Sequence, residues 1–205
     1  MNYTTLASDE TLATVVAALK ERNIEAMVVE NKEAALEKIK ELIPPGASVM
    51  NGSSTTLQQI GYIDYLKSGA HGWNNLHEGI LAEKDPAKQA LLRKQAVLSD
   101  YYLGSVHALS EAGELLIASN SGSQLPHVVY TSPNVIFVVS THKIMPTLAA
   151  AQERLLEHVV PLEDQRMKEA GMGGTKLNKL VTFFGEPEYT GRKLRMVLVK
   201  EKIGF

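Results

Sequence analysis

The fold class of this chain is decided by the stretch Ala47-Ser48-Val49-Met50-Asn51-Gly52-Ser53-Ser54-Thr55-Thr56-Leu57. Residues 47–50 predict a short apolar strand, and the apolar residues Leu57, Ile60 and Ile63 predict a helix that begins soon after it. Gly52 allows a tight turn between the two, and the hydroxyl groups behind it can cap the new helix. Small polar residues between a strand and a helix often bind ligands, and the free N–H groups of a helix start attract anions. This stretch therefore indicates a site for an anionic small molecule.

A second interpretation of the same residues is purely structural, because a cap and a tight turn need no ligand. The stretch is not a phosphate-binding loop of the Walker type, since no Lys-Ser or Lys-Thr pair follows the glycine. It is not a dinucleotide-binding turn either, because it lacks the Gly-x-Gly-x-x-Gly pattern. The stretch alone leaves both interpretations open.

Helical and strand patterns alternate on both sides of this stretch. A helix is predicted over 12–19 behind Ser8, a strand over 24–29, and a second helix over 36–43 behind Asn31. Residues 135–139, Val-Ile-Phe-Val-Val, are apolar on both faces, which is typical of a central strand covered on each side. The sequence therefore predicts an α/β fold with a mainly parallel sheet flanked by helices.

The remaining segments fit one domain that spans residues 1–205. Strands are predicted over 101–103, 114–118, 180–184 and 196–199, and Asp85-Pro86 begins another helix. Residues 68–84 predict a long, mobile surface loop. A glycine-rich hinge at 171–174 is expected to begin a closing C-terminal segment, residues 171–205.

Composition excludes several classes of function. Of 205 residues, 44% are hydrophobic and 21% charged, and the formal net charge is −2, so that the basic surface of a nucleic-acid or membrane-surface binder is not expected. The chain has no cysteine, which excludes disulfides, thiolate catalysis and cysteine-held clusters. No signal-peptide pattern and no apolar run of about 20 residues is present, so we expect a cytoplasmic protein. We expect no cofactor.

Three polar segments are predicted to meet at the carboxyl edge of the sheet: residues 51–56, 119–124 and 142–143. Each follows a predicted strand, and parallel strands end at the same edge. The second segment is also compatible with a loop that binds no ligand. The candidate ligand-binding residues are Asn51, Gly52, Ser53, Ser54, Thr55, Ser119, Ser121, Gly122, Ser123, Lys143 and Lys179.

Two residues are candidates for acid–base or nucleophilic roles. Glu111 lies four residues after His107, where it could orient a substrate or move a proton, but its place beside Ala112-Gly113 favours an ordinary solvated turn residue. His142 stands beside Lys143 just after a predicted strand, where it can act as an acid or a base or can simply end the strand. His71 and His77 are six apart, which is the wrong spacing for a helical metal pair, and we expect no metal site.

The order of several motifs resembles that of the LUD domain family of lactate-utilisation proteins. The resemblance covers about residues 10–205. Its motifs are residues 51–57 with Gly61, residues 96–103, Gly104-Ser105-Val106-His107-Ala108-Leu109-Ser110-Glu111-Ala112-Gly113, Ser121-Gly122-Ser123-Gln124-Leu125-Pro126, His142-Lys143-Ile144, Asn178-Lys179-Leu180 and the closing stretch 195–205.

The resemblance implies a fold like that of the phosphosugar isomerase and coenzyme A transferase superfamily. It also implies a role linked to the oxidation of L-lactate to pyruvate, in which sister subunits carry iron–sulfur clusters. The superfamily's isomerases have an acid after a Gly-Ala motif, whereas this chain has Gly104-Ser105-Val106. Its coenzyme A transferases have a glutamate before a glycine, and here Ala112 separates Glu111 from Gly113.

Three functions follow from these observations. The first is an accessory subunit without its own redox centre that binds an anionic metabolite, whether a carboxylate, a phosphate or a coenzyme A compound. The second is an enzyme of the coenzyme A transferase or phosphosugar isomerase type. The third is a structural subunit that docks iron–sulfur partners. A homo-oligomer is compatible with all three.

Overall fold

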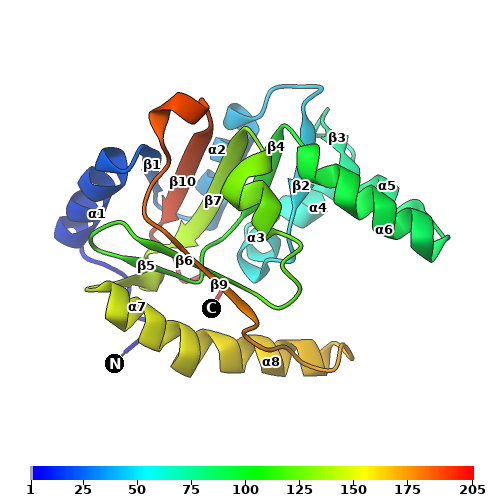
Figure 1. Ribbon diagram of the computed structural model, residues 1–205. Coiled ribbons are helices and arrows are strands. Elements are labelled where there is room, and N and C mark those ends of the chain that lie inside the picture. Colours follow the sequence, from blue (N-terminus) through cyan, green and yellow to red (C-terminus); the bar gives the residue numbers. More distant parts are fainter. Residues whose placement is uncertain (1) are drawn as a thin grey trace.

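A parallel sheet of six strands forms the centre of the computed structural model, which describes residues 2–205 (Figure 1). The strands, in spatial order, are β1 (Ile24–Val29), β10 (Lys193–Val199), β7 (Asn134–Ser140), β4 (Tyr101–Gly104), β2 (Ser48–Asn51) and β3 (Asn74–Asn75). Every neighbouring pair is parallel, so all six carboxyl ends lie along one edge. The predicted α/β fold with a mainly parallel sheet is confirmed.

The strand β7 is buried from residue 135 to residue 140 because apolar layers cover both of its faces. Val135, Phe137 and Val139 pack into one hydrophobic cluster, whereas Ile136 and Val138 pack into another. The first cluster is shared with α1 (Asp9–Glu21) and a second sheet. The second cluster is shared with α2 (Lys32–Leu42), α3 (Thr55–Gln59) and α4 (Tyr62–Lys67). The alternation of strand side chains thus joins the two halves of the core.

The second sheet has four strands in mixed orientation. In spatial order they are β8 (Ile144–Met145), β5 (Ala108–Ser110), β6 (Leu115–Ser119) and β9 (Lys179–Phe183). The pairs β5–β6 and β6–β9 are antiparallel, and β5–β8 is parallel. The predicted strands over 114–118 and 180–184 are therefore present, but in this sheet. The sequence did not predict β5 or β8, which have three and two residues.

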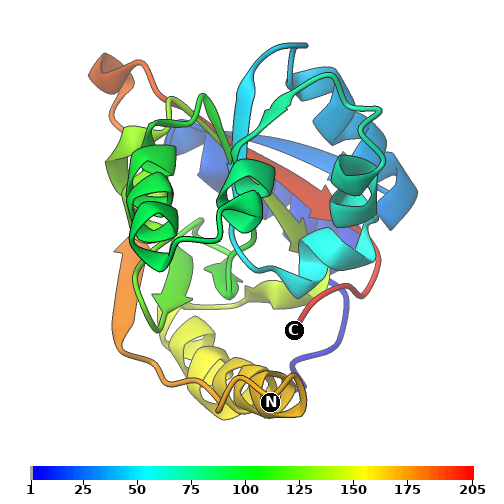
Figure 2. The same ribbon diagram turned by 90° about the vertical axis from the view of Figure 1, so that its right-hand side faces the viewer.

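A long helical segment runs along the outside of the second sheet (Figure 2). It consists of α7 (Leu148–Arg154), the π-helical turn η4 (Leu155–Val159) and α8 (Val160–Glu169). The small side chains of Ala150 and Ala151 pack against Ala108 of β5, which allows close approach of helix and sheet. The remaining short turns are η1 (Ala96–Leu98), the π-helical η2 (His127–Thr131), η3 (Thr141–Lys143) and η5 (Glu188–Thr190).

Residues 68–84, which the sequence predicts as a loop, contain regular structure instead. They include β3, which pairs with β2, and α5 (Leu76–Ala82), which begins behind the cap Asn75. The side chain of Trp73 anchors the segment: it is 8% exposed, and its Nε1 donates to the Ile43 carbonyl over 3.1 Å. This contact joins residues 30 positions apart, so that no local pattern indicates it.

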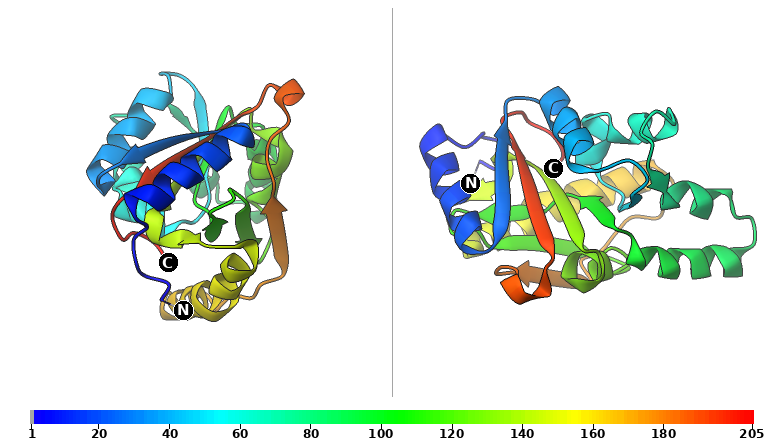
Figure 3. Two further views of the ribbon diagram at one scale, coloured as in Figure 1. Left: turned by 90° about the vertical axis from the view of Figure 1, so that its left-hand side faces the viewer. Right: turned by 90° about the horizontal axis from the view of Figure 1, so that it is seen from above.

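Beyond α5, the helix α6 (Pro86–Gln95) completes an arm that projects from the body (Figure 3). The side chain of Asp85 caps α6, as Ser8 and Asn31 cap α1 and α2. None of the ten residues of α6 is buried. Within residues 2–205, no helix is long and apolar enough to cross a membrane.

The predicted closing segment 171–205 supplies one strand to each sheet. It begins with Gly171, Gly173 and Gly174, which all have positive φ, and continues into β9 of the second sheet. It then returns as β10 between β1 and β7 of the main sheet. The C-terminal segment therefore ties the two sheets together.

We expect Trp73→Ala to lower the free energy of unfolding by about 3–5 kcal/mol, since it removes a buried aromatic side chain. Leu81→Ala on the same segment is the control, because Leu81 is 60% exposed and its truncation is expected to cost less than about 0.5 kcal/mol. Urea unfolding measures both changes. Equal, small effects would show that residues 68–84 are a loop without a tertiary anchor.

Candidate functional site

A cavity of about 370 Å³ lies where the carboxyl edge of the main sheet faces the second sheet and α8. Four strands of the main sheet lead into it, because Gly52 follows β2, Ser105 follows β4, Lys143 follows β7 and Gly204 follows β10. Clefts at the carboxyl ends of parallel strands are the usual ligand sites of open α/β sheets.

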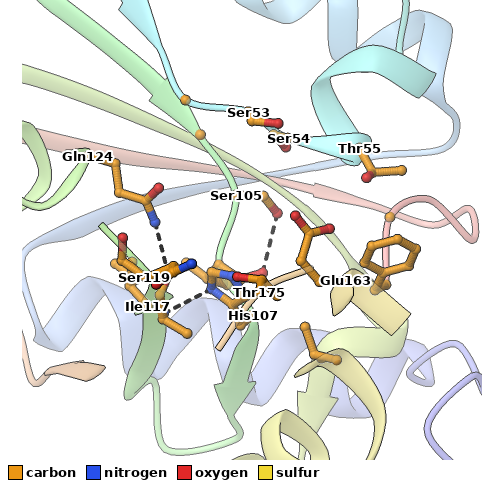
Figure 4. A pocket seen from close by; sticks show the side chains of 18 of the residues that line it. Ser53, Ser54, Thr55, Ser105, His107, Ile117, Ser119, Gln124, Glu163 and Thr175 are labelled. Atoms are coloured by element: carbon orange, nitrogen blue, oxygen red, sulfur yellow. Dashed lines mark hydrogen bonds between the residues drawn. The ribbon is translucent and has the colours of Figure 1, made fainter. Parts of the chain in front are cut away.

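Two serine-rich segments face each other across this cavity (Figure 4). One is residues 52–56, after β2. The other is residues 119–124, after β6, which belongs to the second sheet. The structure thus brings the predicted segments together, but by the packing of two sheets rather than by the common edge of one.

The turn at Gly52 has a steric reason. A Cβ atom on Gly52 would lie 2.6 Å from the hydroxyl oxygen of Tyr102, whose ring stacks on His127 with a centroid distance of 4.6 Å. Only glycine therefore fits beneath this ring pair. Behind the turn, Ser54 Oγ accepts from the Leu57 N–H over 3.2 Å and caps α3.

Lys143 brings a positive charge to the inner end of the cavity. Its side chain is buried, and Nζ donates to Thr56 Oγ1 and Ser105 Oγ, both at 3.2 Å, and to the Val106 carbonyl at 3.4 Å. A Cβ atom on Gly204 would lie 2.9 Å from the same Nζ and would overlap Thr56 Oγ1. Because residue 204 is glycine, the segment that follows β10 can pass directly over the amine of Lys143.

Within residues 2–205, no carboxylate forms a salt bridge with Lys143. Glu163 of α8 is the only acidic residue among the described residues that line the cavity, and Arg166 binds its two oxygens over 2.7 Å each. Burial, followed by the charge of Arg154, lowers the pKa of Lys143 to about 7. A buried amine without a counter-ion is costly, and groups of this kind concentrate at functional sites.

Arg154 of α7 adds a second interior cation. It is fully buried, and one guanidinium nitrogen, Nη1, donates to the His107 carbonyl over 2.6 Å. Its Nε and Nη2 have no hydrogen-bond partner among the described residues. Burial lowers the pKa of Arg154 to about 10. The field of this side chain therefore acts on the inner wall of the cavity.

His107 lines the cavity in its neutral form. Its Nδ1 accepts from the Ala118 N–H over 3.1 Å. Burial, together with the charges of Lys143 and Arg154, lowers its pKa to about 4. In the sequence analysis His107 was considered only together with Glu111, as a possible acid–base pair. In the structure β5 separates these two residues.

The outer part of the cavity is apolar on one side. Val159, Val160 and Met167 come from the helical segment, and Leu177 and Phe205 come from the C-terminal segment. The cavity thus combines a cationic, hydroxyl-rich inner end with an apolar wall, an arrangement that suits a small molecule with an anionic head.

The predicted site residues fall into three groups. Those that line the cavity are Gly52, Ser53, Ser54, Thr55, Ser119, Ser121, Ser123 and Lys143. Those that lie next to lining residues without being among them are Asn51, Gly122 and Lys179. Asn51 is buried and donates to the Gly52 carbonyl, and the Lys179 ammonium donates to the Asn120 carbonyl.

The two predicted catalytic residues do not line the cavity. Glu111 lies in the turn between β5 and β6, where its N–H donates to the Met145 carbonyl over 2.8 Å. His142 is buried with Nδ1 at 2.7 Å from Ser140 Oγ, and burial lowers its pKa to about 3. The predictions for both residues therefore gain no support from the cavity.

Ser105 and Arg154 are not among the residues predicted from the sequence, and Thr56 was predicted only as the last residue of the segment 51–56. Ser105 carries the same signal as Ser53, since it is a polar residue directly after a strand. Arg154 carries no such signal, because it lies inside a helix and reaches the site only through the packing of α7. Within residues 2–205, no group of three or more histidine, aspartate or glutamate side chains could hold a metal ion.

The burial of Lys143 leads to a prediction about stability. We expect Lys143→Met to raise the free energy of unfolding by about 1–4 kcal/mol near neutral pH, since an apolar side chain of similar length replaces a buried charge. The pKa of Lys143 is about 7 in the fold and 10.5 in water, so the unfolded chain binds more protons between these values. Stability of the unsubstituted protein should therefore rise across this range, and the advantage of the methionine variant should fade.

Urea unfolding at several pH values measures this effect. Lys176→Met is the matched control, because Lys176 also lines the cavity but is exposed and should change stability by less than about 0.5 kcal/mol. A loss of stability in Lys143→Met at every pH would show that Lys143 is a structural residue.

Comparison with solved structures supports the fold. The chain resembles the crystal structure of a DUF162 family protein from Deinococcus radiodurans, with a TM-score of 0.56 and 11% identity. The match covers 95% of this chain and 98% of that chain. At this identity the likeness concerns the fold alone. Among curated proteins, no relative matches the chain.

Comparison with protein families gives a more specific result. The model of the LUD domain matches residues 12–198, which is nearly the whole chain and includes most of the segments that line the cavity. The name of this domain refers to lactate utilisation. The chain belongs to the LUD domain family.

Proposed function

We propose that this protein is an accessory subunit of L-lactate utilisation that binds a small anionic metabolite in the cavity at the carboxyl edge of the main sheet. The observation that carries the proposal is Lys143, a buried cation that lines the cavity and has no carboxylate partner among the described residues. Because an isolated buried charge destabilises a fold, an anionic ligand that neutralises it accounts for its presence.

The surrounding groups favour a compact anion such as a carboxylate or a phosphate. Thr56 and Ser105 place hydroxyl groups beside the amine, and Ser53, Ser54 and Ser123 line the same cavity. Hydroxyl groups and an ammonium group are suitable donors for carboxylate and phosphate oxygens. The apolar wall then accommodates the uncharged part of the metabolite. A coenzyme A compound would place its acyl end in the cavity.

The absence of cysteine supports the accessory role. The chain cannot hold a cysteine-ligated iron–sulfur cluster, so electrons from lactate would pass through other subunits. We propose that such iron–sulfur subunits are its partners. The projecting arm favours a docking function in addition, because Leu81 and Leu91 on it are 60% and 54% exposed. Leu98 of η1, just after α6, is 75% exposed. Copurification of iron–sulfur proteins with the native chain, and its loss in Leu91→Glu, tests this second function.

We expect one of four compounds, lactate, pyruvate, inorganic phosphate or coenzyme A, to bind in the cavity. Calorimetric titration measures the heat of binding. Lys143→Met should weaken the binding of the recognised anion by about 10-fold to 150-fold, which corresponds to about 1.5–3 kcal/mol for a hydrogen bond to a charged group. Ser53→Ala combined with Ser54→Ala should weaken it too, whereas Lys193→Met, far from the cavity, should not. Binding unaffected by the first two changes would place the site elsewhere.

Anion binding should also depend on pH. An anion favours the protonated form of Lys143, whose pKa in the free protein is about 7. Below that pH the affinity should be constant, and above it the affinity should fall by up to tenfold per pH unit, because binding must then take up a proton.

Titration with a carboxylate between about pH 6 and about pH 9 measures this dependence, since the charge of the ligand itself is constant there. Lys143→Met provides the control, which should show weak and pH-independent binding. An affinity of the unsubstituted protein that is flat across this range would separate Lys143 from the binding site.

A further inference from the structure

The surroundings of the Lys143 amine suit a nucleophile as well as a group that binds an anion. It lines the cavity, so that a small molecule can reach it, yet its side chain is only 4% exposed. The hydroxyl groups of Thr56 and Ser105 lie 3.2 Å from Nζ, and the charge of Arg154 acts on the same amine. A primary amine is therefore buried among polar groups at the wall of the cavity.

We propose that Lys143 Nζ forms a reversible imine with the carbonyl carbon of a small 2-oxo carboxylate held in the cavity. The proposal rests on the proposed function of the cavity as an anion site, and it adds a covalent step and a ligand class. Lysine side chains with desolvated amines next to another cation are the usual Schiff-base nucleophiles of proteins.

The surroundings of Lys143 favour the reactive form of the amine. Burial and the charge of Arg154 lower its pKa to about 7, so a large fraction of Lys143 is uncharged at neutral pH. An exposed lysine with a pKa near 10.4 is uncharged to well under about 1% at the same pH. Lys176, which lines the cavity, and Lys179 are exposed lysines of the C-terminal segment.

The reaction balances with the ligand and the lysine alone. The lone pair of the neutral amine attacks the carbonyl carbon, and a C–N bond forms as the carbonyl π bond breaks. The two hydrogens of the amine leave with the carbonyl oxygen as one water molecule, and a C=N bond remains. Ser105 and Thr56 lie within hydrogen-bond distance of Nζ and can relay these protons to the leaving oxygen.

A 2-oxo carboxylate fits this site better than a simple ketone. Once the imine is protonated, its nitrogen keeps the positive charge of Lys143, and the carboxylate on the adjacent carbon neutralises that charge. The positive charge of Arg154 also stabilises the carboxylate. Nε and Nη2 of Arg154 have no hydrogen-bond partner among the described residues. The side group of the oxo acid then lies toward Val160 and Leu177 in the apolar part of the cavity.

Reductive trapping tests the proposal on the full-length native protein. Pyruvate with cyanoborohydride should add the mass of pyruvic acid less one oxygen atom, and peptide mapping should place the adduct on Lys143. Lys143→Met should lose this adduct, whereas Lys193→Met, at the start of β10 and outside the cavity, should keep it. Acetone, which lacks the carboxylate, should give at least tenfold less adduct. L-Lactate, which lacks the carbonyl group, should give none and should compete with pyruvate.

Each alternative outcome is decisive. Adduct spread over Lys176, Lys179 and other exposed lysines, with acetone as effective as pyruvate, would overturn the proposal. Calorimetric binding of pyruvate that depends on Lys143, without any trapped adduct, would also overturn it while the proposed anion site stands. Absence of both binding and adduct would overturn both. If Lys143→Met fails to fold, the position of the adduct in the unsubstituted protein decides the question.

Discussion

The burial of β7 on both faces is the constraint on which the rest of the structure depends. Its side chains alternate between the core shared with α2, α3 and α4 and the core shared with α1 and the second sheet. A strand enclosed in this way delivers the residues that follow it to the interior rather than to the surface. Lys143, three residues beyond the end of β7, is therefore buried at the point where the two sheets meet. The cavity, its hydroxyl groups and its electrostatics are organised around that amine.

The buried charges at the inner end of the cavity lower the stability of the fold. Lys143 and Arg154 are buried without a carboxylate partner among the described residues. Burial, together with the charges of these two residues, keeps His107 and His142 in the neutral form. A fold gains nothing from such a cluster, since each charge loses hydration. By contrast, the buried pair of Arg192 and Glu186 has a structural purpose: Arg192 donates to the carboxylate and to carbonyl groups of the π-helical turn η2. Violations of the usual rules of burial concentrate at binding sites, and this contrast supports the proposed site at Lys143.

The main features of the fold could be predicted from local pattern. The apolar run 135–139 indicated a central strand, and Ser8, Asn31 and Asp85 indicated helix starts that the structure contains. The errors have physical causes. Residues 68–84 are held by Trp73 through a contact distant in sequence, and β5 and β8 are too short to show a period. The predicted helix after residue 55 is split into α3 and α4 at Gly61, whose φ of 80° interrupts the helix.

The sequence by itself determined the fold class, the positions of the polar segments at strand ends and the absence of cysteine ligands. It did so because these features depend on residues that are neighbours along the chain. Only the tertiary structure decided that Ser119 approaches Gly52 from a second sheet, that Glu111 lies outside the cavity, and that Lys143 is desolvated beside Arg154. The protonation and reactivity of an amine depend on burial and on charges acting through space. Those quantities come from segments far apart in sequence, and folding alone brings them together.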